Sequence, residues 1–339
     1  MNLRSQRVTV QDLGDWRESA VGALGRFLSR WGTALAGAVL LAVLLSHVSL
    51  TELARTLRGA HPGYVLAAVL CGLLATAVRV VRYGHFFPPH RRWLQLYGVF
   101  SLLRLINYAL PFRSGEVVAL GLLKKRGLAP TVAETSAIWF VLRCADFTAL
   151  FLLLAAAVNL SVSTHAADPR LQNAALALAS LSLLAVVVLP IVLHWAIRRR
   201  VVRQGRGWLA RQRQAMEDGL QKLQGHRALL WTMVPALLVW TANIGMTTCA
   251  LLACGAPISA CDAALASVIV LAFNLLPIRP PLALGTGDAA WAGTLVLLGV
   301  GTAEAIALAL GVRLVQMLVT AMDGCIGVAV PTIDRSGKD

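Results

Sequence analysis

The sequence predicts an all-α polytopic membrane protein with about six spanning helices and two broken or re-entrant helical segments in an inverted internal repeat. Of its 339 residues, 58% are hydrophobic and only 14% are charged, and the mean hydropathy is +0.70. A soluble domain carries about 25% charged residues, so lipid must surround most of this fold. Several apolar runs reach the roughly 20 residues that a helix needs to cross a bilayer.

Residues 1–30 form a basic arm ahead of the first apolar run. Asp12, Asp15 and Glu18 interrupt this arm, unlike the apolar core of a signal peptide. We expect either an interfacial amphipathic helix or a disordered arm. Residues 31–330 are predicted to form a single transmembrane domain, followed by a short tail, 331–339. Uninterrupted apolar runs predict six spanning helices: residues 31–50, 64–81, 131–158, 173–195, 228–253 and 304–330.

Two further apolar segments, 93–123 and 261–300, contain prolines with glycines close by. Proline removes a backbone N–H and clashes with the preceding helical turn. A break of this kind is tolerated at membrane depth where the backbone is buried in protein or lines a cavity. We therefore predict a broken or re-entrant helix in each segment, with these residues at the breaks: Pro111, Gly115, Pro277, Gly285 and Gly287.

The basic residues indicate an orientation, because short cytoplasmic loops carry an excess of lysine and arginine. Most of the 31 lysines and arginines lie in the N-terminal arm, in residues 82–92 and 124–126, in the loop 196–227 and in the tail. Only Arg55, Arg58 and Arg170 fall on the opposite side. Both termini are therefore predicted to be cytoplasmic, in a bacterial inner membrane. The 196–227 loop either contacts anionic headgroups or simply follows the positive-inside rule.

A weak internal repeat relates residues 64–195 to residues 228–330. The order asparagine, proline, arginine, glycine and acid occurs twice: at Asn107, Pro111, Arg113, Gly115 and Glu116, and at Asn274, Pro277, Arg279, Gly285 and Asp288. A further membrane arginine follows each motif, Arg143 in the first half and Arg313 in the second. Broken helices in corresponding positions are typical of transporters that bind their substrate near the bilayer midplane.

Charged residues within apolar segments are the candidate site. A charge at a helix centre costs about 2.5–3.5 kcal/mol on insertion scales, so such residues face a cavity, a partner or a substrate. Arginine offers a planar fork that suits phosphate or carboxylate. The candidate substrate-binding residues are Asn107, Arg113, Glu116, Arg143, Asp146, Arg279, Asp288 and Arg313. Alternatively, the arginines form structural ion pairs with Glu116, Asp146, Asp288 and Asp323, while Arg79, near the end of its span, snorkels to the interface.

The sequence contains no motif for metal binding, for a redox-active cysteine pair or for the catalysis of a soluble enzyme. The six cysteines form no CxxC pair, and the seven histidines form no metal-binding spacing. Cys254 and Cys261 flank a predicted outer loop and are either thiols or an oxidised pair. We expect no cofactor, no metal and no catalytic residue of a soluble enzyme. Nucleic acid is not an expected partner, because the basic residues lie between apolar runs and not on one folded face.

At these motifs the sequence resembles the flippase-like family typified by the transmembrane domain of lysylphosphatidylglycerol synthases, over about residues 30–330. The resemblance implies an inner-membrane protein that moves lipids or lipid-linked sugars between leaflets. It maps these residues onto the family's motif positions: Asn107, Pro111, Arg113, Gly115, Glu116, Arg143, Asp146, Pro277, Gly285, Gly287, Asp288 and Arg313. This chain departs from the pattern at residues 277–285, where a Pro-rich stretch replaces a shorter glycine-rich turn. We expect no lipid aminoacylation from residues 1–339 alone.

Three functional hypotheses remain open. The first is a translocator of an anionic phospholipid or a polyprenyl-linked lipid, with the headgroup drawn to Arg113 and Arg279. The second is a membrane-embedded transferase that uses Glu116 or Asp288 as acid or base. The third is a non-catalytic partner of a lipid-modifying synthase. A homo-oligomer is compatible with each of them.

Overall fold

A computed structural model describes residues 58–86, 93–109, 115–128, 131–164, 226–274 and 285–336, together with the single positions 173 and 180. Within these ranges the chain forms helices and no strands. The helices are α3 (Pro62–Phe86), α4 (Trp93–Ala109), α5 (Gly115–Lys125), α6 (Val132–Thr164), α9 (His226–Ala253), α10 (Ala260–Phe273), α11 (Thr286–Leu297) and α12 (Thr302–Ser336). The all-helical prediction is confirmed for this part of the chain.

Four helices are long and apolar enough to cross a membrane: Pro62–Phe86, Val132–Leu160, Leu230–Ala253 and Thr302–Ala329. They match four of the six predicted spans. The predicted span 31–50, and 173–195 apart from two single positions, lie outside the described residues. Leu66, Leu70 and Leu74 follow one another at helical spacing on α3 and are exposed, as expected of a surface that faces lipid. The protein is a multi-pass membrane protein.

The same order of elements occurs twice along the chain. A long helix (α3), two short ones (α4 and α5) and a second long helix (α6) are followed by α9, α10, α11 and α12 in the same sequence of long, short, short and long. The residues between the short helices, 110–114 and 275–284, contain the predicted breaks at Pro111 and Pro277 and lie outside the described residues. In each apolar segment with prolines, the structure describes one short helix before these residues and one after them.

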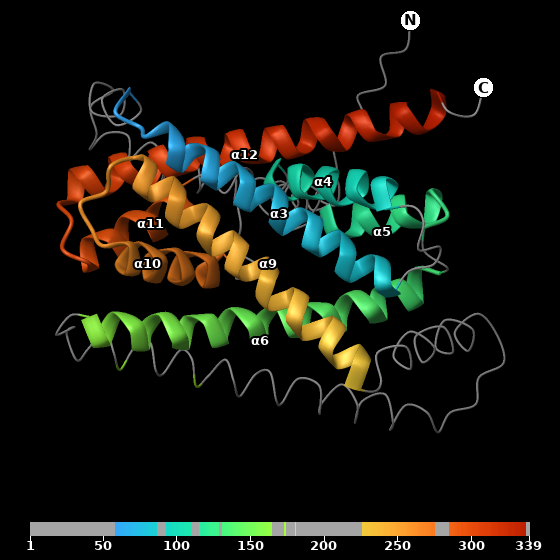
Figure 1. Ribbon diagram of the computed structural model, residues 1–339, viewed down its shortest axis with the longest axis horizontal. Coiled ribbons are helices and arrows are strands. Elements are labelled where there is room, and N and C mark those ends of the chain that lie inside the picture. Colours follow the sequence, from blue (N-terminus) through green and yellow to red (C-terminus); the bar gives the residue numbers. More distant parts are fainter. Residues whose placement is uncertain are drawn as a thin grey trace, which may run out of the picture.

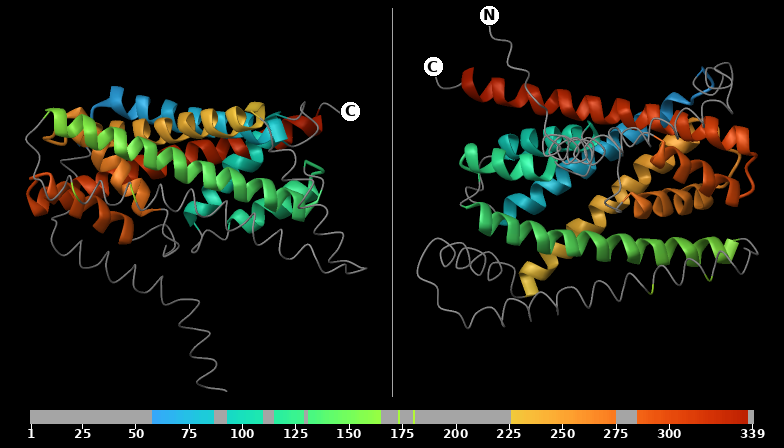
Figure 2. Two further views of the ribbon diagram at one scale, coloured as in Figure 1. Left: turned by 90° about the horizontal axis from the view of Figure 1, so that it is seen from below. Right: turned by 180° about the vertical axis from the view of Figure 1, so that it is seen from behind.

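The packing of the helices follows the same correspondence. Helix α3 packs along α9, α4 packs on α12, and α10 packs on α6. In Figure 1, α12 and α6 run along opposite edges of the bundle, and α3 and α9 cross between them. The edge-on view places α3 and α9 along one side and the two pairs of short helices on the other (Figure 2). Each half of the chain therefore packs its first short helix against the last long helix of the other half.

Glycine allows the closest of these contacts. A Cβ atom added to Gly327 on α12 would lie 2.7 Å from the Cβ of Ser101 and 3.2 Å from the carbonyl oxygen of Gly98, both on α4. At Gly72 on α3, it would lie 2.3 Å from a methyl group of Val319 on α12. Small residues that let helix backbones approach are the usual basis of helix association in lipid. These contacts hold α12 against α3 and α4, where the polar groups described next lie.

Candidate functional site

A cavity of about 190 Å³ lies between the two halves of the bundle. Six helices contribute to its wall: α3, α4, α6, α9, α10 and α12. Asn107 and Tyr108 reach it from the end of α4, and Asn274 reaches it from the end of α10. The asparagines of the two repeated motifs therefore meet at one cavity, next to the two predicted helix breaks.

Three arginines line this cavity: Arg79, Arg104 and Arg143. Arg79, on α3, is half-buried and forms neither a hydrogen bond nor an ion pair with any described residue. Arg104 lies 3.5 Å from a carboxylate oxygen of Asp323, and Arg143 lies 3.4 Å from one of Asp146. The cavity wall contains no aspartate or glutamate among the described residues.

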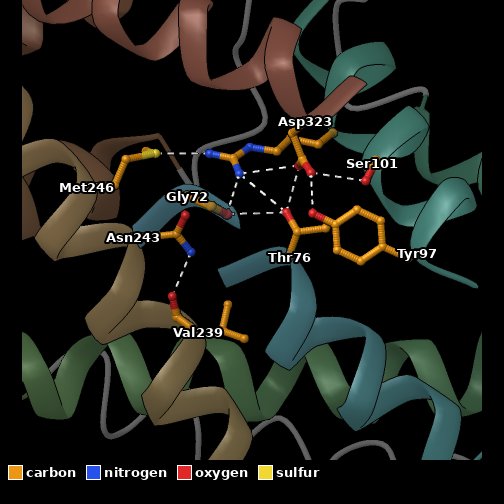
Figure 3. Close-up of polar contacts among 9 residues, drawn as sticks. Gly72, Thr76, Tyr97, Ser101, Val239, Asn243, Met246 and Asp323 are labelled. Carbon is orange, nitrogen blue, oxygen red and sulfur yellow. Dashed lines mark hydrogen bonds and ion pairs between the residues drawn. The ribbon is translucent and has the colours of Figure 1, made fainter. Parts of the chain in front are cut away.

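Asp323 is the centre of a buried polar cluster on α12, which we call the Asp323 cluster (Figure 3). Its carboxylate accepts hydrogen bonds from the hydroxyl groups of Thr76 at 2.7 Å, Tyr97 at 2.9 Å and Ser101 at 3.0 Å. The Arg104 guanidinium donates to the Gly72 carbonyl at 2.8 Å and approaches the carboxylate at a longer distance. Three neutral donors thus stabilise the charge of Asp323 more closely than the arginine does.

Asp146 is the other carboxylate behind the cavity wall. It forms a buried ion pair with Arg82, whose side chain is only 1% exposed, and a longer one with Arg143. Arg82 also donates to the carbonyl of Leu142, as a buried arginine must when one carboxylate cannot satisfy its five N–H groups. Because Asp146 is shared by two arginines, it cannot neutralise both.

The ion pairs leave a surplus of positive charge. Four arginines and two aspartates lie at the cavity or in the ion pairs behind it: Arg79, Arg82, Arg104, Arg143, Asp146 and Asp323. The difference is two positive charges among the described residues. An unbalanced charge inside a membrane protein is costly, so the described part of the cavity wall favours an anion.

Neutral polar groups complete the wall. The side-chain amide of Asn243 donates to the Val239 carbonyl at 2.8 Å, which leaves its amide oxygen without a donor in the part of the chain described (Figure 3). The amide oxygen of Asn107 and the indole nitrogen of Trp240 are buried and have no partner among the described residues. An unmade buried hydrogen bond costs about 1–3 kcal/mol.

A comparison with protein families agrees with the membrane architecture. The family model described as the lysylphosphatidylglycerol synthase TM region matches residues 29–322. The chain belongs to this family. The match includes every residue that lines the cavity, and it confirms the family resemblance of the sequence motifs. No curated protein and no solved structure matches the chain.

The structure places the family-motif residues in two separate environments. Asn107 and Arg143 line the cavity, and Asp146 lies behind Arg143. Asp288 and Arg313 are not part of its wall and form a buried ion pair between α11 and α12, with Nε of Arg313 2.5 Å from the carboxylate. The structural ion pairs that the sequence offered as an alternative are present at Asp146, Asp288 and Asp323.

The start of α11 is capped from within the chain. Gly285 has φ +76°, a conformation that glycine adopts without strain, and its N–H donates to Asp288 at 3.1 Å. Asp288 is 1% exposed, and Gly287 is buried beside it. This carboxylate satisfies a backbone donor of the first turn, the type of group that a ligand at a helix N-terminus would use.

Several other predicted site residues lie outside the part of the chain that the structure describes. Pro111 and Arg113 in the first break, and Pro277 and Arg279 in the second, lie outside the described residues. Gly115 begins α5, and the side chain of Glu116 in the same turn is outside the described set. The described residues contain no group of three or more histidines, cysteines, aspartates or glutamates that could hold a metal. Cys254 and Cys261 are both thiols.

Sequence reasoning missed Arg79, Asn243 and Trp240 as cavity residues. Arg79 lies near the end of an apolar run, where snorkelling is the expectation, yet its side chain lines the cavity. Asn243 carries a usable signal, because it is an amide within the apolar run 228–253. Tryptophan is common in spans, and its sequence position alone gives no sign that its N–H lacks a partner.

Proposed function

We propose that this protein moves a lipid with an anionic headgroup between the two leaflets of the bacterial inner membrane. Family membership supports a membrane protein related to lipid handling. The observation that carries the finer proposal is the arginine-lined cavity between helices long enough to span a bilayer, with two surplus positive charges among the described residues. A phosphate is the charged group common to membrane lipids that an arginine fork binds well.

The repeat supports a mechanism for alternating access. The exchange of partners between the halves, α4 on α12 and α10 on α6, is the pattern expected of two repeats related by a two-fold axis. In the proposal the repeats have inverted topology, their broken segments are re-entrant, and rocking of one half against the other exposes the cavity to each leaflet in turn. Arg113 and Arg279 then lie at the two breaks and draw the headgroup inward. Both termini face the cytoplasm in this proposal.

The test is leaflet exchange in proteoliposomes. A panel of fluorescent phospholipids and polyprenyl-phosphate sugars is reconstituted with the purified protein, and the fraction accessible to a membrane-impermeant quencher is followed with time. We expect exchange of an anionic lipid that protein-free vesicles lack. Arg79→Gln should abolish most of it, whereas Lys124→Gln, at an exposed position on α5, should leave it unchanged. Absence of exchange for every lipid would refute the translocator.

A further inference from the structure

We propose that the Asp323 cluster is a binding site for a monovalent metal cation, sodium or potassium, and that a guanidinium nitrogen of Arg104 occupies the position of that cation in this structure. The cluster lies between α3, α4 and α12, and Arg104 connects it to the cavity. The proposal concerns an ion and is independent of the molecule that the cavity binds.

Three oxygen atoms of different kinds surround the Nη1 atom of Arg104. The carbonyl oxygen of Gly72 lies 2.8 Å from it, the hydroxyl oxygen of Thr76 lies 3.3 Å from it, and a carboxylate oxygen of Asp323 lies 3.5 Å from it. Oxygen atoms are the ligands of hard cations, and backbone carbonyls coordinate sodium in transporters. The N–H groups of a guanidinium lie in one plane, whereas a spherical ion attracts ligands from every direction.

The contacts of Arg104 are weak for a buried arginine. Its distance of 3.5 Å from Asp323 exceeds the roughly 2.7–2.9 Å of a charge-assisted hydrogen bond. Its Nη2 atom donates to the sulfur of Met246 at 3.0 Å, and a thioether is a weak acceptor. The described contacts do not include the bidentate geometry that makes arginine–carboxylate pairs strong. Arg104 is therefore easier to displace than an arginine bound in a fork.

The hydrogen bonds around the carboxylate can remain when a metal ion replaces Nη1. Thr76 donates its hydroxyl hydrogen to Oδ2 of Asp323, and Tyr97 and Ser101 donate theirs to Oδ1 (Figure 3). A hydroxyl oxygen keeps two lone pairs while it donates. The Thr76 oxygen can therefore bind a cation and hold Asp323 at the same time.

The single carboxylate determines the charge of the ion. Asp323 is fully buried, and the described contacts of the cluster include no second acid. A monovalent cation replaces the guanidinium charge for charge. A divalent ion would add a positive charge beside the arginines of the cavity, and an unbalanced charge in a membrane protein is costly. Because the oxygen ligands come from three helices, no local sequence motif marks this site.

The cavity provides the space for the exchange. Arg104 lines its wall with a side chain that is 14% exposed, so the guanidinium can turn from the cluster toward the cavity. The cavity volume of about 190 Å³ is several times the roughly 30 Å³ of one water molecule, so water can complete the coordination of the ion. Asp323 belongs to the second half of the chain and its hydroxyl donors belong to the first. A role of the ion in coupling movement of the halves to transport rests on the proposed function, whereas the site itself does not.

The test asks whether an alkali cation rescues a variant that lacks the guanidinium group. Arg104→Met removes the charge and keeps an unbranched side chain. The purified full-length protein in a non-ionic detergent is unfolded in choline, sodium, potassium or magnesium chloride at equal ionic strength, and tryptophan fluorescence follows the transition. In choline we expect a lower unfolding temperature than for the wild type, because Asp323 has lost its cation. Sodium or potassium should restore at least half of the difference, whereas the control Lys124→Met, at an exposed position of α5, should respond to the four salts as the wild type does.

Further variants separate the site from a general salt effect. In the Arg104→Met background, Thr76→Val removes one oxygen ligand and should raise the half-saturating cation concentration at least tenfold, and Asp323→Asn should abolish the rescue. Arg104 competes with the ion in the wild type, so its half-saturating concentration should be at least tenfold higher than that of Arg104→Met. If Arg104→Met does not fold, the wild type and Thr76→Val are titrated instead. A saturable alkali-cation response that Thr76→Val weakens would support the site, and equal responses would overturn it.

The remaining outcomes are equally decisive. The same unfolding temperature of Arg104→Met in choline and in both alkali salts would overturn the site. Rescue by magnesium alone would overturn the monovalent class, and rescue by acidic pH without an alkali-cation effect would assign a proton to the cluster in place of a metal ion. Cation rescue without leaflet exchange of any lipid would uphold the site and refute the translocator. Leaflet exchange by the wild type, without cation rescue of the variant, would refute the site alone.

Discussion

The buried pair between Asp288 and Arg313 provides a sharp test of which motif residues hold the fold together. Replacing Arg313 with leucine leaves the Asp288 carboxylate, 1% exposed, with the Gly285 N–H as its remaining partner among the hydrogen bonds described above. Removing one partner of a buried ion pair costs about 3–5 kcal/mol, because the other charge stays buried without compensation. At about 2 °C per kcal/mol for a chain of this size, the unfolding temperature should fall by roughly 6–10 °C.

The assay is thermal unfolding of the purified protein in detergent, followed by intrinsic tryptophan fluorescence. The double variant Asp288→Asn with Arg313→Leu removes both charges and should regain at least half of the loss. The matched control is Lys125→Leu, which removes a positive charge at an exposed position of α5. If Arg313→Leu unfolded within 1 °C of the wild type but lost lipid binding, the pair would belong to the substrate site and not to the packing of α11 on α12.

Three further predictions concern packing, reactivity and the Asp323 cluster. Gly327→Ala brings a Cβ against the backbone of α4 and should lower the free energy of unfolding by about 1–3 kcal/mol through overpacking. This loss should be measured as a lower unfolding temperature. The control Gly121→Ala, whose Cβ has nothing within 4 Å, should not lower it. Burial raises the pKa of the Cys254 thiol to about 11 from an ordinary value of 9.0. In a variant with this single cysteine, maleimide labelling at pH 8 should therefore be about a hundredfold slower than for an ordinary thiol and should accelerate with pH. Labelling at the ordinary rate would contradict the buried environment. Asp323→Asn leaves Arg104 without its carboxylate and should lower the unfolding temperature more than Thr76→Val, which removes one of three hydroxyl donors; equal shifts would contradict the cluster as drawn.

The spanning helices are the part of the fold that the sequence predicts well. A run of about 20 apolar residues has few structural alternatives in lipid, because every backbone group must be bonded within the segment. The four spans that the structure describes therefore coincide with apolar runs. Pro111 and Pro277 likewise predict two short helices in place of one long helix, since proline cannot supply the missing N–H.

The cavity depends on packing between distant segments, which local patterns do not encode. Thr76 and Asp323 bond to each other although they are 247 positions apart in the chain. The pairing of Arg143 with Asp146 is local, at a spacing of three residues, and is visible in the sequence. The tighter partner of Asp146 is Arg82 on another helix, and only the folded arrangement shows that Arg79 lines the cavity without an ion pair to a described carboxylate.

The two residues of the Asp288 and Arg313 pair illustrate the same difference. Both stand at motif positions, both are charged within apolar segments, and the sequence treats them in the same way as Arg143. In the structure they bond to each other and Asp288 also caps α11, whereas Arg143 reaches the cavity. Two buried charges with a similar cost of burial can thus have different roles. A charge whose partner lies within the fold stabilises the packing, whereas a charge that reaches the cavity can bind a ligand.

The central claim is that the cavity carries an anionic headgroup across the membrane by contact with Arg79. The most direct test is the rate of leaflet exchange of phosphatidylglycerol by Arg79→Gln relative to the wild type, at equal protein content and with equal unfolding temperatures. Loss of a charge-assisted hydrogen bond worth about 1.5–3 kcal/mol predicts a rate about ten to a hundred times lower. A rate within threefold of the wild type would contradict the account.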